Sequence, residues 1–440
     1  MKRRAFLQST LAGMSALSVS TKILAAKQKA GGKIHNFPEG FLWGPSTAAH
    51  QVEGNNTNSD YWLLEHLANS PFVEPSMDTC DHYHQYPQDI KLIADLGFNC
   101  YRFSVEWARI EPEKGYFSKA SLDHYRHMAQ VCHEYGIKPL VTFHHFTSPL
   151  WFAAQGGWEN PESIDLFSRY CEKVARHLGD LITLVCTINE INFTAQLDAK
   201  NFIPMERRRS VMNAAAKSMG VKHFSSPPLG EPALITDNML KAHHQGRLAI
   251  KSVTPNVAVG LSLTMIDMQA VSGGEKKLKE LQYAIEDRFL EEIKHDDYVG
   301  VQAYTREIIN EDGFMPVEKG AELTQMGYEF WPNALEATIR HAASIVRVPI
   351  YVTENGVGIA EDTKRIEYIN GALKGLSRCL EDGIDVKSYI HWSLMDNFEW
   401  TNGYEPTFGL IAVDRQTFKR TLKPSAKFLG KIARENAFSS

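Results

Sequence analysis

The feature that most constrains the fold of this chain is an alternation of two kinds of segment along almost all of its 440 residues. Short runs rich in β-branched and aromatic residues alternate with longer stretches that carry apolar residues at helical spacing. The eight runs cover residues 41–48, 99–107, 138–146, 184–191, 256–265, 298–305, 349–356 and 387–394. Several are almost continuously apolar, which is typical of parallel strands buried on both faces. The alternation predicts the α/β class and a single-domain (β/α)8 TIM barrel.

The stretches between the runs show how the helices and loops are arranged. Clear helical patterns cover residues 86–97, 121–136, 167–180 and 363–383, and three of them end at a glycine, the residue that most readily adopts the left-handed conformation at a helix C-terminus. The gap between residues 192 and 255 is longer than one helix requires. Its basic part, residues 205–226, is predicted to be a loop insertion over the face that carries the strand ends, with its charged side chains in solvent.

Composition excludes several classes of function. The formal net charge is only −5, which gives no reason to expect a nucleic-acid or membrane-surface partner. No run of 18 apolar residues is present, so no integral membrane segment is expected. The cysteines show no CxxC pair and no zinc spacing, so they indicate no metal site, and most are expected to be buried free thiols. They are Cys80, Cys100, Cys132, Cys171, Cys186 and Cys379. No metal or organic cofactor is implied elsewhere in the sequence.

The N-terminal segment has the pattern of an export signal. Arg3 and Arg4 precede Phe6 and Leu7, a weakly apolar stretch follows, and small residues stand at positions 25 and 26. This order predicts a twin-arginine signal over residues 1–26 and a periplasmic or secreted protein; an ordinary basic N-terminus is the alternative. The remaining chain is divided into a flexible lead-in at 27–36, the barrel at 37–432 and a C-terminal tail at 433–440.

Polar side chains stand where the apolar runs stop. In such barrels the side chains at the carboxyl ends of the strands meet on one face, where catalysis takes place. The runs therefore predict an active site on that face. The candidate residues are Gln51, Arg102, His145, Asn189, Glu190, Tyr304, Glu354 and Glu399.

Two of these carboxylates have the surroundings that acid/base and nucleophilic chemistry need. Glu190 follows the apolar run LVCTIN, so partial desolvation should raise its pKa toward that of a general acid. Glu354 precedes a tight Asn-Gly turn, and a nucleophile there would need donors such as Arg102 and Tyr304 to stay ionised. In retaining glycosidases two such carboxyl groups lie about 5–5.5 Å apart. From the residues alone, a salt-bridged carboxylate at a strand end remains the alternative for Glu190.

Seven ordered sequence blocks resemble glycoside hydrolase family 1, the β-glucosidase family. They are FPEGFLWGPSTAAHQVEG, YRFSVEWARIEP, VTFHHFTSPLWF, TINEIN, TQMGYEFWPNAL, YVTENG and HWSLMDNFEWTNGYEPTFGL, and the resemblance covers residues 37–427. It implies Glu190 as acid/base and Glu354 as nucleophile, with Arg102 and Tyr304 orienting the nucleophile. It also implies a platform for the sugar at Trp392. Finally, it implies contacts to the hydroxyls of the cleaved sugar from Gln51, His145, Asn189, Glu399 and Trp400.

The resemblance implies a retaining β-glycosidase, most simply a β-glucosidase, that releases a terminal unphosphorylated sugar from a glycoside or oligosaccharide by double displacement. The carboxylate of Glu399 would repel a 6-phosphate. A transglycosidase would use the same two glutamates. A non-catalytic sugar-binding protein is less favoured because both carboxylates are present. Neither the aglycone nor the oligomeric state follows from the sequence. The apolar Phe202, Met205, Met212 and Phe224 hint at an apolar aglycone, although such residues more often pack an insertion onto its barrel.

Four sites depart from the family pattern. Ile191 replaces a usual proline after the acid/base, Val185 and Phe146 replace usual tryptophans, and Gln302-Ala303 replaces Asn-Tyr. Loss of the proline relaxes the backbone beside Glu190. We expect an altered substrate preference rather than a loss of activity.

Overall fold

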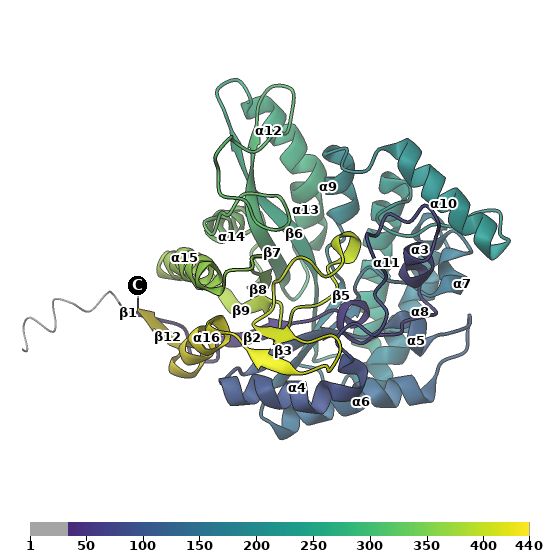
Figure 1. Ribbon diagram of the computed structural model, residues 1–440, viewed down its shortest axis with the longest axis horizontal. Coiled ribbons are helices and arrows are strands. Elements are labelled where there is room, and N and C mark those ends of the chain that lie inside the picture. The colour runs from purple at the N-terminus through teal and green to yellow at the C-terminus, as the bar shows by residue number, and fades with distance from the viewer. Residues whose placement is uncertain (1–33, 440) are drawn as a thin grey trace, which may run out of the picture.

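The computed structural model describes residues 34–439, and its centre is a closed barrel of eight parallel strands (Figure 1). Each strand pairs with the next in sequence, and the last pairs with the first. Every predicted run coincides with one barrel strand, although β6 and β7 extend beyond the ends of their runs and β9 begins one residue earlier, so the predicted (β/α)8 fold is confirmed. The strands are β2 (Leu42–Ser46), β3 (Cys100–Ser104), β4 (Lys138–His144), β5 (Leu184–Ile188), β6 (Ala258–Ala270), β7 (Val299–Ile309), β8 (Ile350–Asn355) and β9 (Val386–Trp392).

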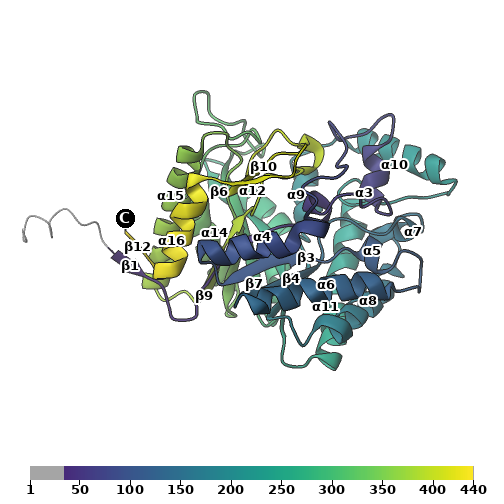
Figure 2. The same ribbon diagram turned by 60° about the horizontal axis from the view of Figure 1, so that its bottom comes forward.

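Helices surround the barrel and cover its outer face, as Figures 1 and 2 show from two sides. The four predicted helical stretches fall within α4, α6, α8 and α15, apart from their terminal residues, and Gly97, Gly136 and Gly383 beyond α4, α6 and α15 have positive φ. The longer helices are α4 (His82–Leu96), α6 (Lys119–Glu134), α8 (Ser163–Leu178), α11 (Pro232–Val253), α14 (Ala334–Ile345), α15 (Asp362–Glu381) and α16 (Pro424–Glu435). The shorter helical elements are α2 (Ala49–Val52), α3 (Asp60–Glu65), α5 (Trp107–Ile110), α7 (Leu150–Ala153), η1 (Gly157–Glu159), α9 (Phe193–Ala199), α12 (Glu275–Gln282), η2 (Tyr283–Asp287), α13 (Arg288–Ile293) and η3 (Trp400–Asn402).

The two ends of the barrel differ in polarity. A buried cluster that includes Leu42, Cys100, Leu184 and Tyr298 fills the end where the strands begin. These residues lie at or just before the first positions of β2, β3, β5 and β7. Since this end is packed with apolar side chains, polar side chains can gather only where the strands finish.

The segments next to the two ends of the chain differ from the prediction. Residues 34–36 of the predicted flexible lead-in form β1 (Ile34–Asn36), which pairs antiparallel with β12 (Ala437–Ser439) from the predicted tail. The pairing has a physical reason, because Phe438 is buried in the main core and His35 stacks on its ring. The predicted export signal at 1–26, and the lead-in up to residue 33, lie outside the described residues.

The basic insertion is more ordered than predicted. Residues 205–226 were expected to form a loop, but they contain the 15-residue helix α10 (Met205–Met219), which ends at Gly220. Val211, Met212 and Ala215 form an apolar side that packs against α3. The residues of this segment, chiefly Arg, Ala, Met and Lys, also favour a helix intrinsically, and the prediction of a loop gave too little weight to that preference. Arg207 and Arg209 are exposed, as expected, but Arg208 is buried and donates through Nε to the backbone oxygen of Ile203 at 2.7 Å.

Two further expectations concern the described residues. All six cysteines are buried and free, which confirms the prediction that most of them are buried free thiols. Between residues 34 and 439, no helix is long and apolar enough to cross a membrane. A small hairpin of β10 (Ile411–Val413) and β11 (Arg420–Leu422) completes the fold.

Candidate active site

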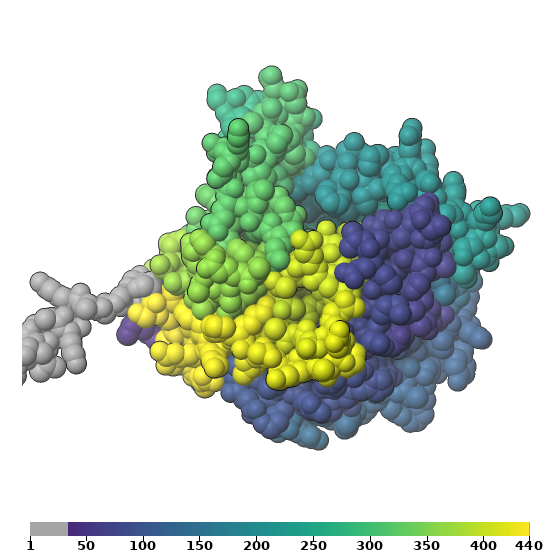
Figure 3. All heavy atoms as spheres, viewed as in Figure 1, coloured from purple at the N-terminus to yellow at the C-terminus, as the bar shows by residue number. Residues whose placement is uncertain are grey.

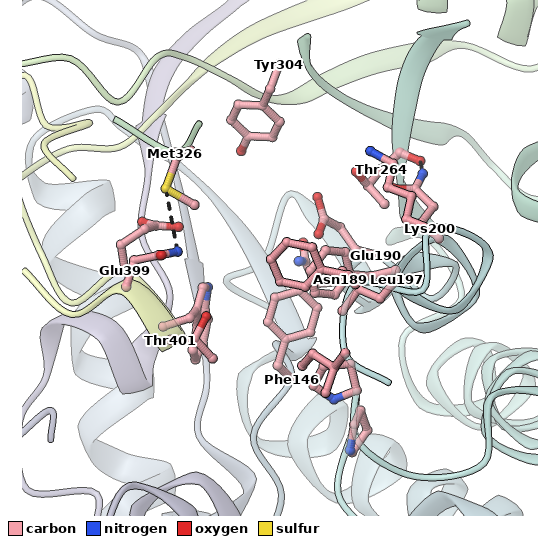
Figure 4. Close-up of a pocket in the computed structure, with 18 of the residues that line it drawn as sticks. Phe146, Asn189, Glu190, Leu197, Lys200, Thr264, Tyr304, Met326, Glu399 and Thr401 are labelled. Atoms are coloured by element: carbon pink, nitrogen blue, oxygen red, sulfur yellow. Dashed lines mark hydrogen bonds between the residues drawn. The ribbon is translucent and has the colours of Figure 1, made fainter. Parts of the chain in front are cut away.

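A cavity of about 310 Å³ opens where the strands finish. Figure 3 shows the face on which the yellow C-terminal segments, the green β6–β7 arm and the teal α9–α10 region meet. Figure 4 shows the cavity itself, with Glu399 and Met326 across from Glu190 and Phe146. Eight of the ten residues singled out in the sequence line it: His145, Asn189, Glu190, Tyr304, Glu354, Trp392, Glu399 and Trp400. Gln51 and Arg102 do not line the cavity, but they are buried and bond to residues that do.

Glu354 is held by two donors from other strands. Nη1 of Arg102 donates to Oε1 at 2.5 Å, and the hydroxyl of Tyr304 donates to Oε2 at 2.5 Å. Arg102 also donates through Nη2 to Oδ1 of Asn189 at 2.6 Å. Burial raises the pKa of Glu354, and the charge and hydrogen bonds of Arg102 and Tyr304 oppose that rise. The predicted orienting pair is therefore in contact with the predicted nucleophile.

Glu190 has the opposite kind of environment. It follows β5 in the left-handed region, with φ 45°, and its Oε1 accepts one hydrogen bond from Nε2 of Gln302 at 2.8 Å. Burial, and then the charge of Glu354, raise the pKa of Glu190 to about 8. Two carboxyl groups that repel each other share protons unequally. Because Glu354 has the cation and the second donor, the shared proton resides on Glu190 near neutral pH.

A buried chain of hydrogen bonds fixes the amide of Gln302, and no local pattern in the sequence predicts this chain. The hydroxyl of Thr353 donates to Oε1 of Gln302 at 3.0 Å, and the hydroxyl of Ser262 lies 3.0 Å from that of Thr353. All three side chains are buried. Gly300 makes room for the chain, because a Cβ there would lie 2.5 Å from the Ser262 hydroxyl oxygen and 2.9 Å from that of Thr353. With its carbonyl satisfied by Thr353, the amide of Gln302 must present its N–H to Glu190.

Polar groups on the opposite wall, and directly behind it, are suited to sugar hydroxyls. Nε2 of Gln51 donates to the backbone oxygen of Phe398 at 2.7 Å and lies 3.4 Å from Oε2 of Glu399. Burial, and then the charge of Glu354, raise the pKa of Glu399 to about 8. Among the described residues, Oε1 of Gln51 and Nδ1 of His145 are buried without a hydrogen-bond partner. Buried polar atoms of this kind are expected to bind a ligand or water.

The imidazole of His145 is neutral in this setting. Burial, and then the charge of Arg102, lower its pKa far below the usual value. Nε2 of His145 lies 3.1 Å from Nδ2 of Asn189, so Nε2 accepts and Nδ1 carries the proton. The ring stacks on Trp392 and Trp400 at centroid distances of 5.9 and 6.1 Å. The site thus combines aromatic faces with hydrogen-bonding groups, as a pyranose requires.

A second supporting pair was missed in the sequence. The ring of His50 stacks on Trp400 at 5.9 Å with an interplanar angle of 7°, and its Nε2 lies 2.7 Å from Oε1 of Glu65. Burial alone would lower the pKa of His50, but the charge and hydrogen bond of Glu65 outweigh it and raise the pKa. His50 directly precedes the candidate residue Gln51, and only this position in the sequence could have indicated a role at the site.

The departures from the family pattern occupy different places. Phe146 lines the cavity with φ 69°, and Gln302 contacts Glu190. Val185, Ile191 and Ala303 are buried in the main core.

Comparison with known proteins agrees with this geometry. The model of glycosyl hydrolase family 1 matches residues 33–317 and 291–438. A β-glucosidase of Agrobacterium sp. is 30% identical, over 90% of this chain and 95% of that protein. Beta-glucosidase A of Acetivibrio thermocellus is 27% identical, over 91% of this chain and 99% of that protein. The crystal structure of the β-glycosidase BGL167 is 48% identical, covers 92% of this chain and 98% of its own, and superposes with a TM-score of 0.88. The chain therefore belongs to glycosyl hydrolase family 1 and is a glycoside hydrolase.

Proposed function

We propose that the protein is a retaining β-glycosidase, most simply a β-glucosidase, which removes a terminal unphosphorylated sugar by double displacement. The main support is that two carboxyl groups in one cavity have different hydrogen-bond partners and charged neighbours. Glu354 receives hydrogen bonds from a cation and a phenol, whereas Glu190 receives them only from neutral groups, the amide of Gln302 and the hydroxyl of Thr264. This difference favours the ionised form of Glu354, as a nucleophile requires, and the protonated form of Glu190, as an acid requires.

In the first step a carboxylate oxygen of Glu354 attacks the anomeric carbon while Glu190 gives its proton to the glycosidic oxygen. The bond to the aglycone breaks, and the aglycone leaves as an alcohol. In the second step Glu190, now ionised, takes a proton from water, and the resulting hydroxide displaces Glu354 from the anomeric carbon. The raised pKa of Glu190 suits the first step, because the acid must be protonated at neutral pH.

The charge of the cavity favours an unphosphorylated sugar. Glu399 lies on the wall next to Trp400, and Lys200 is the only lysine or arginine among the described residues that line the cavity. Nζ of Lys200 donates to Glu307 at 2.5 Å, so its charge is already balanced. A phosphate dianion would find carboxyl groups and no free cation.

The direct test is a pair of amide variants. Glu354→Gln and Glu190→Gln should each lose turnover of an aryl β-glucoside by at least about 10²-fold, with an unchanged circular dichroism spectrum. A fluorosugar inactivator should label Glu354, as mass spectrometry of peptides would show. Parent-level turnover by both folded variants would refute the assignment.

The same two glutamates would also serve a transglycosidase, in which an alcohol replaces water in the second step. Product analysis with added alcohol separates the two activities. A dominant glycoside product at low alcohol concentration would favour transfer.

The location of the enzyme is part of the proposal. Residues 1–26 act as a twin-arginine export signal, so the enzyme works in the periplasm or outside the cell. The support is the order of Arg3, Arg4, the weakly apolar stretch and the small residues. Replacing both arginines by lysine should leave the activity in the cytoplasmic fraction of an expressing bacterium. Unchanged export of that variant would contradict this assignment.

A further inference from the structure

The outer part of the cavity, beside Glu190, is apolar. An acid that protonates the glycosidic oxygen must stand next to the leaving group, so the wall on that side faces the aglycone. The chain supplies this wall directly after Glu190, through α9 and the turn that follows it. Its lining side chains are Phe193, Leu197, Phe202 and Ile203.

Aromatic rings connect this wall to the sugar end of the cavity. Phe146 packs edge-on against Trp400 at a centroid distance of 5.2 Å and stacks on Phe193 at 5.4 Å. Phenylalanine at position 146 offers no ring N–H to a hydroxyl group. Phe202 lies further out and is 67% exposed, and it extends the apolar lining formed by Phe193, Leu197 and Ile203 toward solvent.

The two long polar side chains on this wall, Gln196 and Lys200, already have partners within the protein. Nε2 of Gln196 donates to the backbone oxygen of Thr264 at 2.8 Å, and Nζ of Lys200 donates to Glu307 at 2.5 Å. A second sugar here would bring several hydroxyl groups to a surface with few free partners, and each buried hydroxyl without a partner is unfavourable. An apolar group would meet no such penalty.

We propose that this enzyme selects glycosides with an apolar aglycone, an aryl group or an alkyl chain of about six carbons, over glycosides whose aglycone is a second sugar. The binding surface is formed by Phe146, Phe193, Leu197, Phe202 and Ile203. This inference rests on the proposed β-glycosidase activity and adds the class of substrate.

The test uses n-alkyl β-glucosides from ethyl to hexyl, because their leaving groups have nearly equal basicity and only the buried apolar area changes. Complete burial of a CH2 group is worth about 0.8 kcal/mol, roughly a fourfold gain. In a half-open groove about twofold per CH2 is expected. kcat/KM should therefore rise by about tenfold or more from ethyl to hexyl, and hexyl glucoside should exceed cellobiose. A flat series, or a preference for cellobiose, would overturn the inference.

Variants assign the effect to the wall. Phe202→Ala, at an exposed position that tolerates truncation, should lower the hexyl-to-ethyl ratio of kcat/KM by at least threefold, and Phe193→Leu should lower it as well. Leu248→Ala removes an apolar side chain that is 62% exposed on α11, away from the cavity, and should keep the parent ratio. Parent ratios in both wall variants would refute the assigned surface.

The β-glycosidase activity and the apolar aglycone site are tested by different outcomes. If no β-glucoside of any kind is hydrolysed, the proposed function is wrong. If ethyl glucoside is hydrolysed but chain length has no effect, the activity stands and only the apolar aglycone site is wrong.

Discussion

Replacing Thr353 by valine should change the pH range in which Glu190 works as an acid. The substitution keeps the shape of the side chain and removes the hydroxyl that donates to Oε1 of Gln302. The buried carbonyl of Gln302 then loses its donor, and the amide can turn so that its oxygen faces Glu190. In that orientation it accepts a hydrogen bond from the protonated acid and no longer stabilises the ionised form.

The size of the effect follows from one hydrogen bond. A bond to a charged group contributes roughly 1.5–3 kcal/mol, and 1.36 kcal/mol corresponds to about one pKa unit. The pKa of Glu190, about 8 in the parent, should therefore rise by about one to two units. Because the acid acts in its protonated form, the basic limb of kcat/KM should move to higher pH. Glu354, Arg102, Tyr304 and Tyr328 also act electrostatically with Glu190, and the side chain of Thr264 gives it a further hydrogen bond. The substitution leaves all of these groups in place.

The assay is kcat/KM for an aryl β-glucoside measured across the basic limb. Thr353→Ser keeps the hydroxyl and should keep the parent profile, so it controls for the loss of packing. Ser262→Ala removes the next hydroxyl of the chain and should give a smaller shift in the same direction. If folded Thr353→Val shows the parent limb, the hydroxyl chain does not orient the amide and the reasoning is wrong.

Three other outcomes follow from buried charges. Arg102→Met should move the acidic limb of kcat/KM to higher pH, because it removes the cation that opposes the raised pKa of Glu354. Removing one partner of a buried ion pair costs about 3–5 kcal/mol. An acidic limb at the parent pH would contradict the pairing of Arg102 with Glu354. Tyr304→Phe should lower kcat/KM by about tenfold or more through loss of one hydrogen bond to a charged group, which steady-state kinetics would show. Burial raises the pKa of Glu286 from 4.5 to about 8. The protonated group therefore contributes stability at low pH, and this contribution is lost as pH rises from the unfolded pKa through the folded one. Glu286→Gln should therefore gain in Tm over the parent as pH rises from about 5 to 9, and an equal difference at both ends of the range would argue against a buried acid.

The candidate site could be predicted best where a general rule of the barrel fold fixes the position of a side chain in space. Parallel strands in a barrel all finish on one face, so a polar residue at the end of an apolar run must approach the others. This rule places Glu190 and Glu354 in one cavity without any knowledge of the helices. It applies less directly to Arg102, which stands within β3 and reaches Glu354 only because its side chain is long.

The features that could not be predicted depend on contacts between distant segments. The chain through Ser262, Thr353 and Gln302 requires the register that sets Ser262 beside Gly300 on the neighbouring strand, and nothing local reveals that register. The helix in the basic insertion is stabilised by its packing on α3. The pairing of β1 with β12 joins segments about 400 residues apart in the sequence.

Two of the departures from the family pattern, Gln302 and Phe146, lie on the acid side of the site, whereas Val185, Ile191 and Ala303 are buried in the main core. The partners of Glu354 follow the family pattern, whereas Gln302 contacts Glu190 and Phe146 lies on the aglycone wall. A change beside the nucleophile would affect both steps, but a change beside the acid matters mainly when the leaving group needs a proton. A phenol leaves with less help than a sugar hydroxyl. If the changed partner of Glu190 weakens the acid and the wall binds apolar aglycones as proposed, aryl glycosides should be the best substrates, because they combine an apolar aglycone with a good leaving group.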